Sequence, residues 1–127
     1  MNETVKQQME AVGVLKNFLD KLIPNLETLC TELKGQRKAD TAAFQKECLD
    51  AFNWVIEVYN RIPDALELSD KKLDKGAVNQ AITELAEALK AGEDALIAEK
   101  LENGVSGFLR ELREITGIVE YVAESGE

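Results

Sequence analysis

The stretch AEKLENGVSGFLREL, residues 98–112, decides the fold, because it holds Asn103-Gly104 and Gly107 inside an apolar pattern of helical spacing. An Asn-Gly pair is typical of a turn. A glycine within a helix, however, costs only about 1 kcal/mol relative to alanine. The pattern predicts one helix over residues 94–123, bent at Gly104–Gly107; the alternative is a fifth helix that begins after Gly104. The apolar positions are Ile97, Leu101, Val105, Phe108, Leu112, Ile115, Val119 and Val122.

The first part of the chain carries a similar apolar stripe, which steps by three or four residues without a miss. It predicts a helix over residues 3–34 that is kinked at Pro24, since proline removes one helical hydrogen bond. Gly35 is suited to end this helix. The stripe consists of Val5, Met9, Val12, Leu15, Leu19, Leu22, Leu26, Leu29 and Leu33.

Two further helices are expected between these long ones. The second covers residues 40–62 and ends before Pro63. The third covers residues 75–91 and ends near Gly92. The least periodic segment, 63–77, is expected to be a connection with a short turn or the ragged start of the third helix.

These elements predict an all-α fold, an antiparallel up-down bundle of four helices formed by one domain over residues 1–127. The third helix is only about half as long as a helix of thirty residues, which reaches roughly 45 Å. Part of the apolar stripes on the first and last helices would then lack a partner. Either segment 63–77 folds over this gap, or a second copy or another protein fills it.

The charge balance excludes some classes of partner. Fifteen Lys and Arg against twenty-four Asp and Glu give a formal charge of −9, which repels phosphate backbones, so we expect no nucleic-acid binding. No apolar run approaches the ~20 residues of a membrane span. The N-terminus lacks the pattern of a signal peptide, and we therefore expect a cytoplasmic protein without membrane contact.

The residues for common catalytic chemistry are missing. The chain has no histidine, which is the usual general base and the commonest zinc ligand. Cys30 and Cys48 fit no zinc-site spacing and are expected to be buried free thiols. Acidic pairs at helical spacing, such as Glu111 and Glu114, flank the apolar stripes and indicate a solvated face. We therefore expect no enzyme, no metal and no cofactor.

Two groups of residues are candidates for an interaction surface. Trp54, the only tryptophan, could form with Val58 and Tyr59 an exposed aromatic anchor. It could equally pack against the third or fourth helix. Gly104 and Gly107 allow either tight helix packing or a groove that admits a partner helix.

The segment KAGEDALIAEKLENGVSGFLREL, residues 90–112, resembles part of an uncharacterised family of small acidic helical bacterial proteins. The similarity lies in an aspartate that opens a long helix and in the core formed by Ile97, Ala98, Leu101 and Glu102. LIPNLETL and AFNWVIEVYNRI are similar to the two earlier helices of that family. The resemblance implies a continuous last helix and no known activity.

Three functions remain open at this point. The first is a non-enzymatic interaction or adaptor bundle, which acts as a homodimer or with another protein. The second is a small acidic export or assembly chaperone that holds an amphipathic helix of a client protein. The third, an enzyme or ligand carrier with a pocket between the helices, is disfavoured as a catalyst by the lack of histidine.

Overall fold

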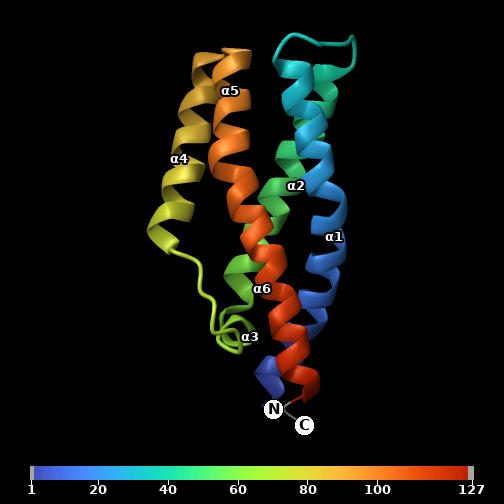
Figure 1. Cartoon of the computed structure of the whole chain (residues 1–127), viewed down its shortest axis with the longest axis vertical. Helices are drawn as coiled ribbons and strands as arrows, with labels where there is room; N and C mark the ends of the chain where they lie inside the picture. The colour runs from blue at the N-terminus through green and yellow to red at the C-terminus, as the bar shows by residue number, and fades with distance from the viewer. Residues whose placement is uncertain (1, 126–127) are drawn as a thin grey trace.

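The computed structural model describes residues 2–125, and all regular secondary structure in that range is helical (Figure 1). The expected all-α class is confirmed. The expected division into four helices is too simple, because a short helix lies in the 63–77 segment and the last helix contains a wide turn. The elements are α1 (Glu3–Leu33), α2 (Thr41–Arg61), α3 (Pro63–Leu66), α4 (Lys75–Ala91), α5 (Asp94–Lys100), the π-helical turn η1 (Leu101–Val105) and α6 (Ser106–Ser125).

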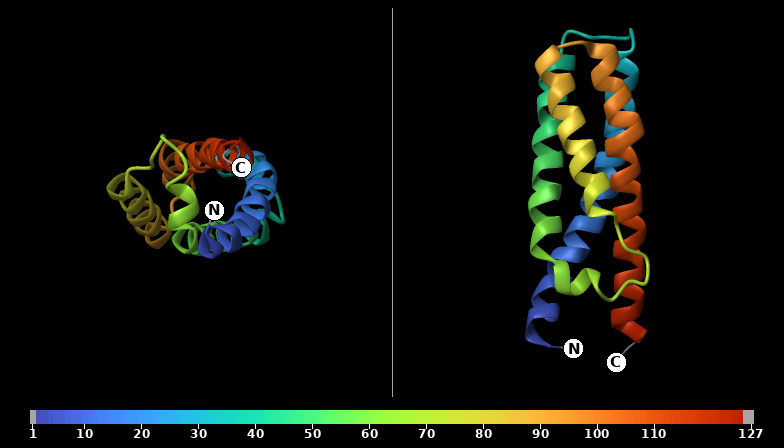
Figure 2. Two further views of the ribbon diagram at one scale, coloured as in Figure 1. Left: turned by 90° about the horizontal axis from the view of Figure 1, so that it is seen from below. Right: turned by 90° about the vertical axis from the view of Figure 1, so that its left-hand side faces the viewer.

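The long helices lie along one axis and alternate in direction (Figure 1). Seen along that axis, they surround a shared interior (Figure 2). Helix α1 packs against α2, α3, α5, η1 and α6, so it is the central element of the core. Helix α4 packs against α5 and η1 and is displaced from the lower half of α6.

Helix α1 is continuous across Pro24, as the unbroken apolar spacing indicates. Its first turn is capped by Asn2, whose Oδ1 accepts a hydrogen bond from the Val5 N–H at 2.8 Å. Eight of the nine positions in the expected stripe are buried, and Met9 is partly buried. Burial of this stripe holds the helix together despite the proline.

Replacing Pro24 by alanine is expected to raise the free energy of unfolding by about 1–2 kcal/mol, less than the ~3 kcal/mol propensity difference. Proline has no N–H for the Asp20 carbonyl, and its exposed ring gives little packing to lose. Part of the gain is offset because proline also restricts the unfolded chain. Urea unfolding measures the change, and Asn25→Ala at the exposed neighbour serves as the control. A less stable alanine variant would contradict this expectation.

The Asn103-Gly104 pair neither stops the helix nor lies in a regular α-helix. Residues Asp94–Ser125 stay helical, but the Ser106 N–H bonds to the Leu101 carbonyl, five residues back. In a regular α-helix, the two successive intervals of four from Ile97 to Leu101 and from Leu101 to Val105 would rotate the side-chain direction by about 80° around the helix axis. The wider turn removes this drift and keeps Leu101 and Val105 buried together.

The gap left by the short α4 is filled by the chain itself. Helix α3 packs against both α1 and α6. The Ala65 N–H donates to Gln8 Oε1 at 2.8 Å, and Gln8 Nε2 donates to Asp64 Oδ2 at 3.2 Å. Ile62 and Ala65 are fully enclosed. The 63–77 segment therefore closes the bundle, and the lower stripes of α1 and α6 are buried without a second copy.

Candidate functional site

The main candidate site is a groove between the first half of α4 and the π turn with the start of α6. Its volume is about 300 Å³. Small and apolar residues dominate its lining, and acidic residues lie among them. We call it the α4–α6 groove; the lining residues used below are Leu73, Asp74, Ala77, Ala81, Gly104, Gly107, Phe108 and Glu111.

Gly104 and Gly107 have different roles in this groove. A Cβ atom on Gly104 would lie 3.1 Å from the Cβ of Ala81, so Gly104 lets η1 approach α4 closely. A Cβ atom on Gly107 would meet nothing within 4 Å. Gly107 is exposed, and the space beside it stays open. The groove is therefore closed at Gly104 and open at Gly107.

The charged groups around the groove are mainly acidic. Asp74 Oδ1 accepts hydrogen bonds from the backbone N–H groups of Gly76 and Ala77 and so caps α4. Glu111 is exposed at the α6 side. Together they favour a cationic partner over an anionic one.

A smaller hollow of about 180 Å³ adjoins the groove on the other side of the Ala81–Gly104 contact. Lys100 Nζ bonds to Glu84 Oε1 at 2.9 Å across it. This hydrogen bond and the charge of Lys100 hold the pKa of Glu84 below its usual value. The pair ties α4 to the last helix at the level where Gly104 permits close approach.

The aromatic candidates turn inward. Trp54 is half-buried, and the centroid of its ring lies 4.6 Å from the ring centroid of Phe18 on α1. Val58 is buried. Tyr59 meets Phe108 edge to face, with ring centroids 5.5 Å apart, but it is not one of the residues that line the groove. The structure therefore brings Gly104 and Gly107 together in the groove, links Tyr59 to it only through Phe108, and places Trp54 against α1.

Sequence reasoning missed the α4 side of the groove. Ala77 and Ala81 are four residues apart and lie on one helix face. This pair of small residues was the available signal. It could not be matched to Gly104 without the distance between α4 and η1.

Both cysteines are free and buried, as expected. The Cys30 thiol lies 3.7 Å from the Ala98 carbonyl oxygen, to which it donates a weak hydrogen bond. Burial is the main cause that raises the pKa of each thiol from 9.0 to about 11. Neither side chain has the depressed pKa of a reactive cysteine.

We expect the stability of the protein to fall as the pH rises from 9 to 11, in part because of these thiols. The folded state holds the thiol protons more tightly than the unfolded state, so their contribution is complete below pH 9 and is lost above it. Urea unfolding at a series of pH values measures the decline.

A Cys30→Ala/Cys48→Ala chain is the control for this decline. It separates the thiols from lysines such as Lys100, whose pKa is raised by Glu84. The double variant should lose less stability over the same pH range. An identical decline in both chains would contradict a role of the thiols.

Residues 2–125 contain neither a candidate metal cluster nor a candidate membrane span. In this range no three histidine, cysteine, aspartate or glutamate side chains are grouped so that they could hold a metal ion. No helix of the described chain is both long and apolar enough to cross a bilayer.

The fold and the groove define an all-helical domain with a small-residue cleft between two helices. The chain belongs to the family described as domain of unknown function DUF8042, whose model matches residues 10–115. The match begins within α1 and ends within α6, so it includes both walls of the groove. Membership of an uncharacterised family is thus confirmed. Neither the curated proteins nor the solved structures gave a match.

Proposed function

We propose that the protein is a non-enzymatic interaction module whose α4–α6 groove docks an amphipathic helix of a partner protein. In this proposal α1, α2, α4 and the α5–α6 segment act as the four helices of an up-down bundle that supports the groove. The observation that carries the proposal is the open space at Gly107 beside the tight contact at Gly104. Glycine and alanine surfaces let a partner helix approach closely.

Shape and charge support a helix that is apolar on one face and basic on the other. The groove offers Leu73, Ala77 and Phe108 as apolar contacts. Its rim carries Asp74 and Glu111, on a chain of formal charge −9. Basic residues beside the apolar stripe of the partner would complement this rim and speed up association.

The same charge disfavours a homodimer, because two copies of −9 repel each other. The 63–77 segment also buries the apolar surface that was the reason to consider a second copy. The proposal therefore prefers another protein as the partner. A cytoplasmic location is part of the proposal, since that compartment keeps free thiols reduced.

An adaptor and a client-holding chaperone would use this groove in the same way. They differ in what happens to the bound helix. An adaptor leaves its partner folded and active, whereas a chaperone keeps its client unassembled until transfer. The groove supports both functions equally.

The test compares Gly107→Gln with Gly117→Gln. Both glycines lie on α6, and a Cβ atom at either position meets nothing within 4 Å, but only Gly107 lines the groove. Tagged wild-type protein and the Gly117→Gln variant should retain one stoichiometric partner from a native cell extract. Gly107→Gln should lose it while remaining folded by circular dichroism.

Light scattering on a sizing column, over a wide concentration range, accompanies this test. A constant mass of 14.1 kDa is expected for the isolated chain. Equal retention by both glutamine variants would place the binding surface elsewhere. A mass of twice the chain that Gly107→Gln abolishes would make the groove a homodimer interface.

A further inference from the structure

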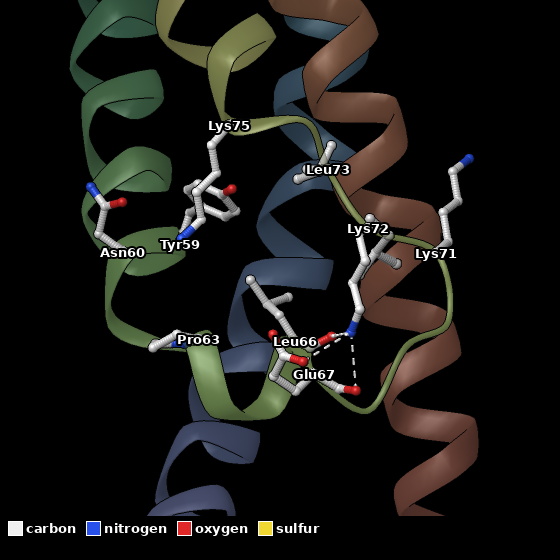
Figure 3. Close-up of a pocket in the computed structure, with 10 residues that line it drawn as sticks. Tyr59, Asn60, Pro63, Leu66, Glu67, Lys71, Lys72, Leu73 and Lys75 are labelled. Carbon is white, nitrogen blue, oxygen red and sulfur yellow. Dashed lines mark hydrogen bonds and ion pairs between the residues drawn. The ribbon is translucent and has the colours of Figure 1, made fainter.

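A second cavity, of about 270 Å³, lies where α2, α3, the segment before α4, and α6 meet (Figure 3). Its apolar wall is formed by Leu66, Leu73 and Ile115, and the ring of Tyr59 lines it as well. Lysines lie around its mouth. We call it the lysine pocket, and its size is close to the lower end of the ~300–1,000 Å³ typical of ligand sites.

The lysines of this pocket differ in which groups their ammonium ions bind. Lys71 Nζ bonds to Glu114 Oε2 at 2.6 Å and points away from the pocket (Figure 3). Lys72 Nζ donates to the carbonyl oxygens of Leu66 and Glu67, at 3.3 and 3.1 Å. Lys72 therefore caps the C-terminal end of α3. The ammonium groups of Lys71 and Lys72 are thus both engaged within the protein.

Lys75 is different. Its side chain extends over the mouth of the pocket toward Tyr59 (Figure 3). Within residues 2–125, Lys75 has no carboxylate partner, whereas Lys71 and Lys72, the other lysines that line this pocket, are each paired. Lys75 is the first residue of α4, and because Asp74 already caps the N–H groups of that helix, the Lys75 ammonium is the cation available to a ligand here.

We infer that the lysine pocket binds a small organic monocarboxylate, whose apolar tail contacts Leu66, Leu73 and Ile115 and whose carboxylate pairs with Lys75. A cation at the mouth of an apolar cavity favours a ligand with a charged head and an apolar body. An uncharged ligand would gain no ion pair with Lys75, which is exposed and stays hydrated. A cationic ligand would be repelled by Lys72 and Lys75.

Two other polar groups fit such a ligand. Burial raises the pKa of the Tyr59 phenol, so its hydroxyl stays protonated and can donate a hydrogen bond. Asn60 lines the same wall of α2 and offers an amide donor. The single acidic side chain on the lining, Glu67, is engaged by Lys72 at 3.5 Å.

Binding here does not depend on the proposed function of the α4–α6 groove. Leu73 lines both cavities, and no other lining residue of the described chain is shared between them. The groove is acidic at its edge and the pocket is cationic. The two sites therefore select different ligands, and each proposal can fail alone.

The experiment titrates the full chain with octanoate, observed by backbone amide NMR. Octanol and octylammonium are the uncharged and cationic analogues of the same length. Octanoate should shift the amides around Leu73, Lys75 and Ile115 in a saturable way. The two analogues should bind more weakly, and the amides of the 34–40 turn at the other end of the bundle should not respond.

Lys75→Gln provides the second arm, because this exposed residue can be changed without disturbing the core. It should weaken octanoate binding about tenfold, as expected for loss of one charged hydrogen bond. Lys38→Gln, which removes an equal charge in the distant turn, should leave the affinity unchanged. The inference is overturned if the octanoate-induced shifts do not saturate, if octylammonium binds as tightly as octanoate, or if Lys75→Gln binds octanoate with the affinity of the wild type.

Discussion

Replacing Phe108 by alanine is expected to lower the free energy of unfolding by about 3–5 kcal/mol. The Phe108 side chain is 6% exposed and connects α6 to α2. Its ring meets Phe52 at 6.2 Å and Tyr59 at 5.5 Å, both edge to face. The alanine variant loses the buried area and both ring contacts, and it leaves a cavity between the two helices.

Urea unfolding followed by circular dichroism measures this loss. Tyr121→Ala on the same helix is the control, because Tyr121 is 70% exposed and its removal should change stability by less than about 0.5 kcal/mol. Phe108→Leu should fall between the wild type and the alanine variant, since it refills part of the space. Equal stability of the two alanine variants would show that the ring cluster does not hold α2 to α6.

Replacing Gly104 by leucine is expected to destabilise the protein by about 1–3 kcal/mol, the usual cost of overpacking. The new Cβ atom would lie 3.1 Å from Ala81 Cβ and 3.6 Å from Ala81 Cα. Because the Ala81 Cβ atom cannot move without its backbone, α4 must move away from η1. Leucine otherwise favours helix over glycine, so the expected loss comes from this contact alone.

Gly107→Leu is the matched control, because a Cβ atom there meets nothing within 4 Å. It should be as stable as the wild type or more stable. Adding Ala81→Gly to Gly104→Leu should restore part of the lost stability, since it removes the opposing Cβ atom. A Gly104→Leu chain as stable as Gly107→Leu would mean that α4 packs less closely than the structure indicates.

The long helices could be predicted from the sequence because each has its own apolar period. The observed bounds of α1, α2 and α4 agree with the predicted ones to within one residue at each end. Proline and glycine mark several of these ends, for example Pro63 after α2 and Gly92 after α4, which has a positive φ of 71°. These signals act over a few residues and need no tertiary information.

The π turn and α3 could not be predicted in this way. Two successive intervals of four, at Ile97, Leu101 and Val105, fit a bent α-helix as well as a wide turn. The choice depends on contacts of η1 with α4 and α1, which come from distant parts of the chain. The docking of α3 depends in the same way on Gln8, which lies 57 residues before Ala65.

From the sequence, only the Gly104–Gly107 side of the candidate groove could be predicted, and neither its α4 side nor its geometry could. Gly104 and Gly107 are candidates from sequence because small residues permit close approach, and both line the groove. The sequence could not show that only Gly104 faces a neighbouring Cβ atom. Trp54 is a candidate from sequence because tryptophan is typical of interfaces. Its contact with Phe18 depends on how α1 and α2 are rotated about their own axes, which the sequence does not show.

The π turn makes residues 101–105 the natural place for the chain to change length. A π turn contains one residue more than the α-helical turn that could replace it, so deleting Asn103 need not rotate α6 relative to α5. A deletion within α6 itself would turn every following apolar side chain by about 100° and expose the stripe. Related sequences that are one residue shorter between Ile97 and Phe108 are therefore expected to keep the bundle.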